Sequence, residues 1–178
     1  NQRDVAGILA MIRHLAATVG RPEAGERLAS SHERRLAAIA AEIASGAAQG
    51  ARPTVYFEEW DDPMISGIRW VSELVEIAGG RDAFPERAAQ PAARDRIVTS
   101  EEVIAAAPDL ILASWCGKKV RPERIAGRPG WDAIPAVRAG RIVEIKSPLI
   151  LQPGPAALTD GLDAIRAALA AIRTEVSA

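Results

Sequence analysis

The sequence predicts an α/β fold in which a mostly parallel sheet is flanked by helices and preceded by one long helix. Three short apolar runs with the character of buried strands, at 54–57, 110–113 and 142–145, are separated by segments with helical spacing. Strands that alternate with helices favour a parallel sheet covered on both faces. Hydrophobic residues make up 48% of the 178, many of them alanine, and aromatic residues only 4%, which favours close-packed helices over a β-sandwich.

Two helices are expected before the first strand. Residues 4–19 have an apolar stripe at helical spacing, formed by Ile8, Leu9, Ile12, Leu15 and Val19. Pro22 then suits the first turn of a second helix, which extends to about Ala48 before glycine and proline end it. At 1.5 Å per residue this helix is about 40 Å long. Such a helix is too long for a simple crossover and is typical of a spacer or spine.

The remaining elements follow from their start and stop signals. The strand at 54–57 leads through the turn 58–63 into a helix at 64–78, which Gly79 and Gly80 end. An extended piece at 96–98 precedes a helix that Thr99 or Ser100 caps and that continues to Ala107. The strand 110–113 precedes the loop 114–119, the strand 142–145 precedes a proline-rich loop, and 158–172 predicts a final amphipathic helix.

The turn Glu58-Glu59-Trp60-Asp61-Asp62-Pro63 contains four carboxylates and an indole at the carboxyl end of a strand. In open α/β sheets this is where ligands bind, and unpaired carboxylates are costly to bury. Two interpretations are equally consistent with the chemistry: a ligand site, or a solvated acidic loop with Trp60 folded onto the core. Paired acids such as Glu58 and Asp61 also occur in glycosidases, but acids adjacent in one loop are more often solvated or helix-capping.

Tryptophans gather near the same edge. Trp60 and Trp115 both follow strands, and Trp70 lies early in the helix after the acidic turn. We therefore expect these three side chains to line one open surface, a platform for a large, flat, partly apolar ligand. For Trp131, wedging of a helix against the sheet is the favoured interpretation.

Several functions are disfavoured. The net charge is −1 and basic residues are not clustered beyond Lys118 and Lys119, so nucleic acid is not an expected partner. Apolar runs are far shorter than a membrane span. His14 and His32 lie on different helices without further ligands at metal-binding spacing, and Cys116 has no histidine after it. With no phosphate loop and no nucleophile elbow, we expect no catalytic residue, no metal and no cofactor.

Nine segments carry a resemblance to a known family. They are VYFEEWDDP (55–63), SGIRWVSEL (66–74), IAGG (77–80), VTSEEV (98–103), PDLI (108–111), SWCG (114–117), PGW (129–131), IPAVRAGRI (134–142) and PGP (153–155). In this order the chain resembles the C-terminal lobe of ABC-importer substrate-binding proteins for cobalamin and iron-siderophores, over residues 1–175. The acidic-tryptophan motif is most similar to the cobalamin-binding branch.

The resemblance implies two α/β lobes joined by one rigid helix, with ligand held between them. Residues 1–20 would be a helix belonging to an N-terminal lobe absent from this sequence, 21–50 the interlobe helix, and 51–178 the C-terminal ligand-binding lobe. The chain departs from the family at the Pro-Gly-Pro loop, where Gln152 and Ala156 stand and the usual arginine is replaced.

The implied function is that of an extracytoplasmic, periplasmic or membrane-anchored, solute-binding component of an ABC importer. The expected ligand is a corrinoid such as cobalamin, with a ferric siderophore or haem as alternatives, bound by Glu59, Trp60, Asp61, Trp70 and Trp115. Glu101 and Glu102 match the family position that docks to the permease. An α/β hydrolase using the acids at 58–62 is the alternative from another class.

The first helix also predicts a self-association. In the two-lobe family its apolar stripe is covered by the N-terminal lobe, and burying one Leu or Ile side chain is worth roughly 1.5–3 kcal/mol. A contiguous uncovered patch of this kind is rare on a monomer. We expect helix 4–19 to pair with a second copy of the chain, or alternatively to fold back onto its own lobe.

Overall fold

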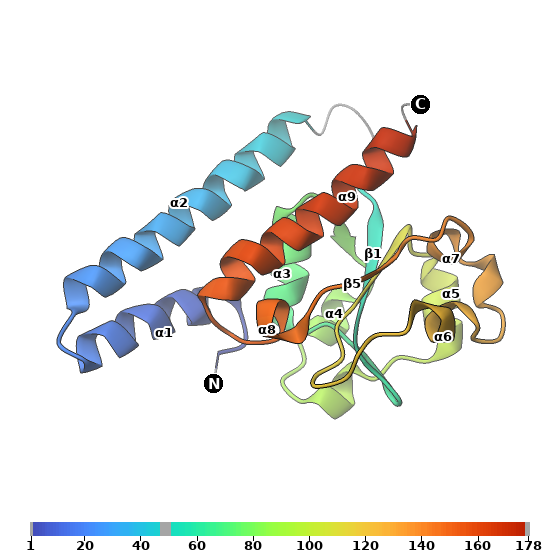
Figure 1. Ribbon diagram of the computed structural model, residues 1–178, viewed down its shortest axis with the longest axis horizontal. Helices are drawn as coiled ribbons and strands as arrows, with labels where there is room; N and C mark the ends of the chain where they lie inside the picture. The colour runs from blue at the N-terminus through green and yellow to red at the C-terminus, as the bar shows by residue number, and fades with distance from the viewer. Residues whose placement is uncertain (1, 47–50, 177–178) are drawn as a thin grey trace.

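The computed structural model describes residues 2–46 and 51–176, and shows a mostly parallel five-stranded sheet flanked by helices (Figure 1). The strand order is β2-β1-β4-β5, with β3 also paired to β1. The β1–β2 pair is antiparallel, and the pairs β1–β3, β1–β4 and β4–β5 are parallel. The strands are β1 (Thr54–Asp61), β2 (Met64–Ser66), β3 (Arg81–Asp82), β4 (Leu110–Ala113) and β5 (Ile142–Glu144). The predicted fold class is confirmed.

Helices cover both faces of this sheet. The chain begins with α1 (Val5–Thr18) and α2 (Pro22–Gly46), and α3 (Arg69–Ile77) follows the β1–β2 hairpin. Short helices follow: α4 (Pro85–Ala88), α5 (Ser100–Ala106), α6 (Pro122–Ala126), α7 (Pro135–Arg138) and α8 (Ser147–Ile150). A π-helical segment, Ala157–Gly161, leads into α9 (Leu162–Val176), which lies beside α2 in Figure 1.

The alternation of strand side chains divides the core into two halves. Val55 and Phe57 of β1 join a cluster with α1, α2, α3 and α9, whereas Tyr56 between them joins a cluster with α5, α6 and α7. Residues 110–112 of β4 alternate in the same way. Because neighbouring side chains of a strand point to opposite faces, an almost continuously apolar strand is required when both faces are covered. This explains the composition of 54–57 and 110–113.

The apolar stripe of α1 is covered by the chain itself. Ile8, Leu9 and Ile12 are buried in the first of these clusters, whereas Leu15 and Val19 are exposed. The start of the helix is fixed to α3: the Val5 N–H donates to Glu73 Oε2 at 2.8 Å, and the Trp70 N–H donates to the Arg3 carbonyl at 3.1 Å. The expectation of an uncovered stripe is wrong for Ile8, Leu9 and Ile12, and the structure leaves only its end uncovered, at Leu15 and Val19. The alternative, fold-back onto the chain's own lobe, is what the structure has, and the argument for a homodimer through helix 4–19 is removed.

The long second helix is tied to α9 as well as to α1. Arg35 is ion-paired with Asp163, and Arg166 with Glu42 at 2.8 Å. The helix spans 25 residues, from Pro22 to Gly46. The predicted end near Ala48 and the breaking glycine at position 50 lie outside the described residues. The second half of the helix is therefore fixed to the lobe that follows it.

The region after the first strand differs from prediction. The strand continues through the acids to Asp61 and turns at Asp62-Pro63 into β2, so 58–63 is mostly strand and not a turn. The predicted helix 64–78 starts only at Arg69, because Met64–Ser66 pairs with β1. Helical spacing within 64–78 could not reveal a pairing with another segment.

The predicted helix start near Thr99 is confirmed. The Thr99 side chain accepts a hydrogen bond from the Glu102 N–H, and the Glu102 side chain accepts one from the Thr99 N–H at 2.7 Å, which completes a capping box. The extended piece before it contributes Ile97, which forms an isolated bridge with Ile65, whereas Ala93–Arg96 is a 3₁₀ turn.

Candidate functional site

The carboxyl ends of three strands meet at one edge of the sheet. Glu58 of β1 lies opposite Ala113 of β4, and Ala113 lies opposite Glu144 of β5. The hairpin after Glu58 and the loops 114–119 and 145–148 therefore start side by side. In open α/β sheets, ligands bind outside the carboxyl ends of the strands, so this edge is the candidate site.

Glu58 connects β1 to the segments that contain Trp115 and Arg128 through buried hydrogen bonds. Its side chain is fully buried and forms two hydrogen bonds with the Arg128 guanidinium, at 2.5 and 3.0 Å. The Trp115 Nε1–H also donates to Glu58, at 3.1 Å, and the Tyr56 hydroxyl donates at 3.2 Å. Burial is the main cause, followed by the Glu58 charge, of a strongly raised pKa for the Tyr56 hydroxyl. A carboxylate with this many partners is a structural anchor.

The other two strand acids are also paired. Glu59 receives two hydrogen bonds from Arg96, at 2.6 and 2.9 Å, and Arg96 is itself only 2% exposed. Asp61 receives two hydrogen bonds from Lys118, both at 2.8 Å. Burial by itself raises the pKa of Asp61, but the Lys118 hydrogen bonds and charge outweigh it, so the pKa is lower than usual.

The solvated-loop interpretation is therefore wrong for Glu58, Glu59 and Asp61, whereas the ligand-site interpretation stays a prediction. Glu59 and Asp61 are each matched to a cation from a distant part of the chain, so their charges are already balanced within the protein. Arg96, Lys118 and Arg128 could not be assigned as partners from sequence, since neither local spacing nor hydrophobic period links them to the first strand.

The expected surface of three tryptophans is also wrong. Trp70 is 5% exposed and donates its Nε1–H to the Ile150 carbonyl at 2.9 Å, within the core on the α1 and α9 side. Trp115 is 2% exposed and packs in the cluster on the opposite face of the sheet. Trp60 is half-buried and lies at the hairpin. Trp131 is fully buried and donates to the Ser100 hydroxyl at 2.7 Å, consistent with a wedge.

Lys118 links the two tryptophans that do lie at the edge. Its ammonium lies 5.2 Å from the centre of the Trp60 ring and 5.0 Å from that of Trp115, while it also contacts Asp61. A cation over an indole face contributes about 0.5–2 kcal/mol. The loop after β4 is thereby fixed to the β1–β2 hairpin.

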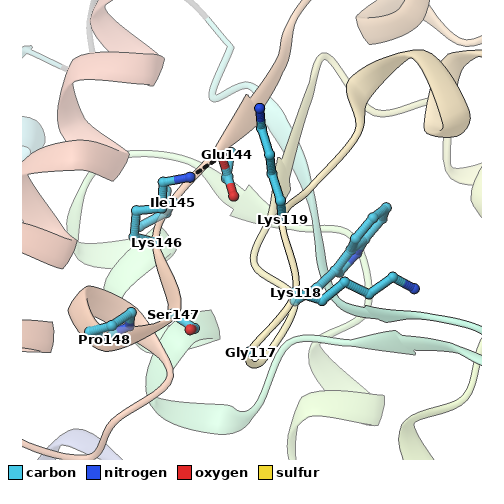
Figure 2. Close-up of a pocket in the computed structure, with 9 residues that line it drawn as sticks. Gly117, Lys118, Lys119, Glu144, Ile145, Lys146, Ser147 and Pro148 are labelled. Carbon is cyan, nitrogen blue, oxygen red and sulfur yellow. Dashed lines mark hydrogen bonds and ion pairs between the residues drawn. The ribbon is translucent and has the colours of Figure 1, made fainter.

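A cleft of about 290 Å³ opens between the loops that follow β4 and β5 (Figure 2). Its lining includes Trp115, the lysines 118, 119 and 146, and Glu144. Glu144 accepts hydrogen bonds from the Val120 N–H at 3.1 Å and from Lys146 at 2.5 Å. The Lys146 hydrogen bond is the main cause of a lowered pKa for Glu144.

Sequence reasoning did not assign the lysines of this cleft to the site, although the signal was present. Lys118 and Lys119 follow one parallel strand and Lys146 follows the next. The rule that drew attention to Glu58 applies equally to these positions.

The two predicted docking carboxylates have different surroundings. Glu102 completes the capping box of α5 and is also paired with Arg87 at 2.9 Å. Glu101 is exposed at the start of the same helix, and hydrogen bonds from its own backbone N–H and from Thr99 lower its pKa. Of these two carboxylates, Glu101 is the exposed one without an ion-pair partner among the described residues.

The chain is similar to a known protein family and to several solved structures. A family model described as periplasmic binding protein matches residues 1–149. The periplasmic heme-binding protein BhuT, in complex with two hemes, is 25% identical with a TM-score of 0.70, and the alignment covers 95% of this chain and 65% of BhuT. The periplasmic heme-binding protein RhuT from Roseiflexus sp. RS-1 is 28% identical with a TM-score of 0.72, and the alignment covers 94% of this chain and 65% of RhuT.

The periplasmic vitamin B12 binding protein BtuF of Vibrio cholerae has the same fold, with a TM-score of 0.71 at 19% identity and coverage of 97% and 64%. This chain thus spans slightly less than two thirds of the length of these three proteins. No curated protein sequence matches significantly. None of the helices in the described residues is both long and apolar enough to cross a bilayer.

Proposed function

The chain belongs to the periplasmic binding protein family, and we propose that it is an extracytoplasmic solute-binding lobe of an ABC importer whose ligand occupies the edge cleft. The observation that carries the proposal is the position of this cleft. It lies at the carboxyl ends of β4 and β5, and Lys118 joins its lining to the half-buried Trp60 of the hairpin. A preformed concave site with a few polar groups is what small-molecule recognition requires.

The ligand that we propose first is a corrinoid. The acidic-tryptophan segment at 55–63 resembles the cobalamin-binding branch, and its acids fix the edge through Arg96, Lys118 and Arg128. A corrin ring is a broad, partly apolar plane that Trp60 would contact from the hairpin. In this proposal the buried Trp115 packs beneath the cleft surface and holds Lys118 in place. Glu59, Asp61 and Trp70 support the edge without touching ligand.

Haem is the second candidate, and a specific observation favours it. BhuT and RhuT, which are 25% and 28% identical to this chain, are described as heme-binding. Haem is also a flat macrocycle, and its two propionates would suit the lysines of the cleft.

A calorimetric titration tests the proposal and separates its candidates. The chain is titrated with cyanocobalamin, haemin and a ferric hydroxamate siderophore in the same buffer. Saturable binding of cyanocobalamin, and weaker or no binding of the other two, supports a corrinoid. Tighter binding of haemin selects the second candidate, and preference for the siderophore contradicts both. Absence of binding by all three contradicts the placement of the ligand on this lobe.

An enzymatic role for the acids at 58–62 is the less favoured function. A glycosidase needs two carboxyl groups that face the substrate. Here Glu58 is completely buried against Arg128, and the Asp61 side chain is 3% exposed and bound to Lys118. The family also consists of proteins that bind solutes.

Docking to the permease is proposed to use Glu101. Its exposed carboxylate at the start of α5 is available to an arginine of a partner, whereas Glu102 is occupied by the capping box and Arg87. Glu101→Arg is expected to abolish binding of the full-length protein to its transporter and to leave ligand titrations unchanged. Glu86→Arg, at the exposed start of α4, is the matched control. Normal transporter binding by Glu101→Arg would contradict this assignment.

A further inference from the structure

The lysines of this chain are few and all lie in one place. Of the 22 basic residues, only three are lysines, and all three line the edge cleft: Lys118, Lys119 and Lys146. Every other basic position is arginine, including the buried Arg96 and the partly buried Arg128 that pair with the strand acids. Arginine offers a rigid planar fork for carboxylates of the protein, whereas lysine offers a mobile point charge with three donors. The cleft therefore has a different cation chemistry from the rest of the chain.

The three ammonium groups have different surroundings. Lys118 is held by Asp61 and by the rings of Trp60 and Trp115, so its charge is already matched. In Figure 2 it points away from Lys119, its neighbour in sequence. Lys118 thus connects the loop to the hairpin and contributes little free charge to the cleft.

Lys119 and Lys146 supply the charge that remains. The Lys119 side chain is exposed, and its ammonium has no hydrogen-bond or ion-pair partner in the described residues. Lys146 is paired with Glu144, a side chain that also accepts the Val120 N–H. Glu144 lies between the two lysines in Figure 2, and the Lys119 charge contributes to its lowered pKa. The single carboxylate of Glu144 therefore balances only one of the two ammonium charges, and the cleft keeps a net positive charge.

We propose that Lys119 and Lys146 form a subsite for an anionic group of the ligand, a phosphate or a carboxylate, with Glu144 as the internal anion that pairs with Lys146 when ligand is absent. The proposal rests on the proposed function, because it concerns the same cleft. For a corrinoid the group is the phosphodiester of the nucleotide loop, and for haem it is a propionate. Charge-assisted hydrogen bonds from ammonium groups to such oxygens are stronger than neutral ones.

The subsite is tested first without the ligand. Reductive ¹³C-methylation labels the three lysines and the terminal amine and keeps their charge, so each lysine gives its own NMR signal, assigned with Lys→Gln variants. Inorganic phosphate, at ionic strength matched with sodium chloride, is expected to shift the Lys119 and Lys146 signals saturably and the Lys118 signal much less. Equal shifts of all three, or shifts that sodium chloride reproduces, would overturn the subsite.

The second test uses ligands that differ in the anion alone. The double variant K119Q/K146Q is expected to bind cyanocobalamin about tenfold more weakly, the effect of losing one or two charge-assisted hydrogen bonds. Its affinity for dicyanocobinamide, which lacks the nucleotide loop and its phosphodiester, is expected to be unchanged. If haemin is the ligand instead, the same comparison is made between haemin and its dimethyl ester.

Two further variants sharpen the result. E144Q keeps an oxygen acceptor for the Val120 N–H but releases Lys146, so it should bind the anionic ligand more tightly. R94Q removes the same charge from a side chain that is 84% exposed and does not line the cleft, and should have no effect.

Equal losses for the ligand and its anion-free analogue in K119Q/K146Q would overturn the subsite while the proposed function stands. If neither macrocycle binds, the proposed function fails, and the phosphate titration still decides the subsite.

Discussion

At the scale of single residues, the chain relies on buried ion pairs at the edge of its sheet. Glu58 is completely buried and the Arg128 side chain is 18% exposed, with two hydrogen bonds between them. Replacing such a pair by apolar residues is often neutral, but removing one partner leaves an uncompensated charge. The pair is therefore more important for the geometry of the edge than for net stability.

Glu58→Ala is expected to lower the free energy of unfolding by about 3 kcal/mol, because the partly buried Arg128, the Trp115 Nε1–H and the Tyr56 hydroxyl then lose their common acceptor. Urea denaturation followed by circular dichroism measures the change. Glu33→Ala is the control: it removes an exposed carboxylate paired with Arg13 and should cost about 0–1 kcal/mol. Similar small losses for both variants would show that Glu58 is not the anchor described here.

His32 gives the chain a predictable pH dependence. Its side chain is buried on α2, and the Nε2 atom is without a hydrogen-bond partner among the described residues. Burial, and secondarily the nearby Arg35 charge, lower the pKa of His32 below the ordinary 6.5. Between these two pKa values the unfolded chain binds more protons than the folded one. Stability is therefore highest above pH 6.5 and falls as the pH decreases from 6.5 toward the lowered pKa.

Thermal unfolding between pH 5 and pH 8 measures this effect. His32→Gln is expected to remove much of the fall in melting temperature in this range. His14→Gln, which changes the other, exposed histidine, should leave the fall in place. A slope that survives His32→Gln would assign the pH dependence to other groups.

At the scale of elements, the close crossing of α1 and α2 depends on one glycine. A Cβ added at Gly25 would lie 2.3 Å from the Cβ of Ala16, whereas one added at Gly46, at the other end of α2, would meet nothing within 4 Å. The absence of a side chain at Gly25 is what lets the two helices approach and bury Ile8 and Ile12.

Gly25→Ala is therefore expected to destabilise the chain by about 1–3 kcal/mol through overpacking, even though alanine is the better helix former by about 1 kcal/mol. Gly46→Ala should be neutral or slightly stabilising. Chemical denaturation of both variants makes the comparison. A stabilised Gly25→Ala variant would mean that helix propensity outweighs the contact and that the two helices separate readily.

Elements with a local signature were predictable from the sequence. The apolar runs 54–57 and 110–113 and the capping box at Thr99 carry their own signals and are found where expected. The β1–β2 hairpin was missed because its strand continues through charged residues. Their burial depends on arginines and a lysine at least 30 residues away in sequence, and no periodicity reports such pairing.

At the scale of the whole molecule, the helical hairpin and the lobe are one packed unit. The first helix is bound to α3, and the second is paired with α9 through Arg35–Asp163 and Glu42–Arg166. The candidate cleft lies on the loops after β4 and β5, formed by elements that do not include these two helices. The strand pattern of the sequence predicts that the ligand site lies at the carboxyl edge of the sheet, and this stays a prediction. The acids and tryptophans were assigned to the site in place of the lysines, because neither spacing nor periodicity in the sequence reveals the internal partners of Glu59 and Asp61.

The central claim, that a corrinoid binds at the carboxyl edge of the sheet, is tested most directly by hydrogen–deuterium exchange with and without cyanocobalamin. Segments 114–120 and 144–150, together with the hairpin around Trp60, are predicted to exchange more slowly in the presence of ligand. The α1–α2 hairpin is predicted to be unchanged. Protection confined to α1 and α2, or no protection anywhere at a cyanocobalamin concentration that saturates the calorimetric titration, would contradict the account.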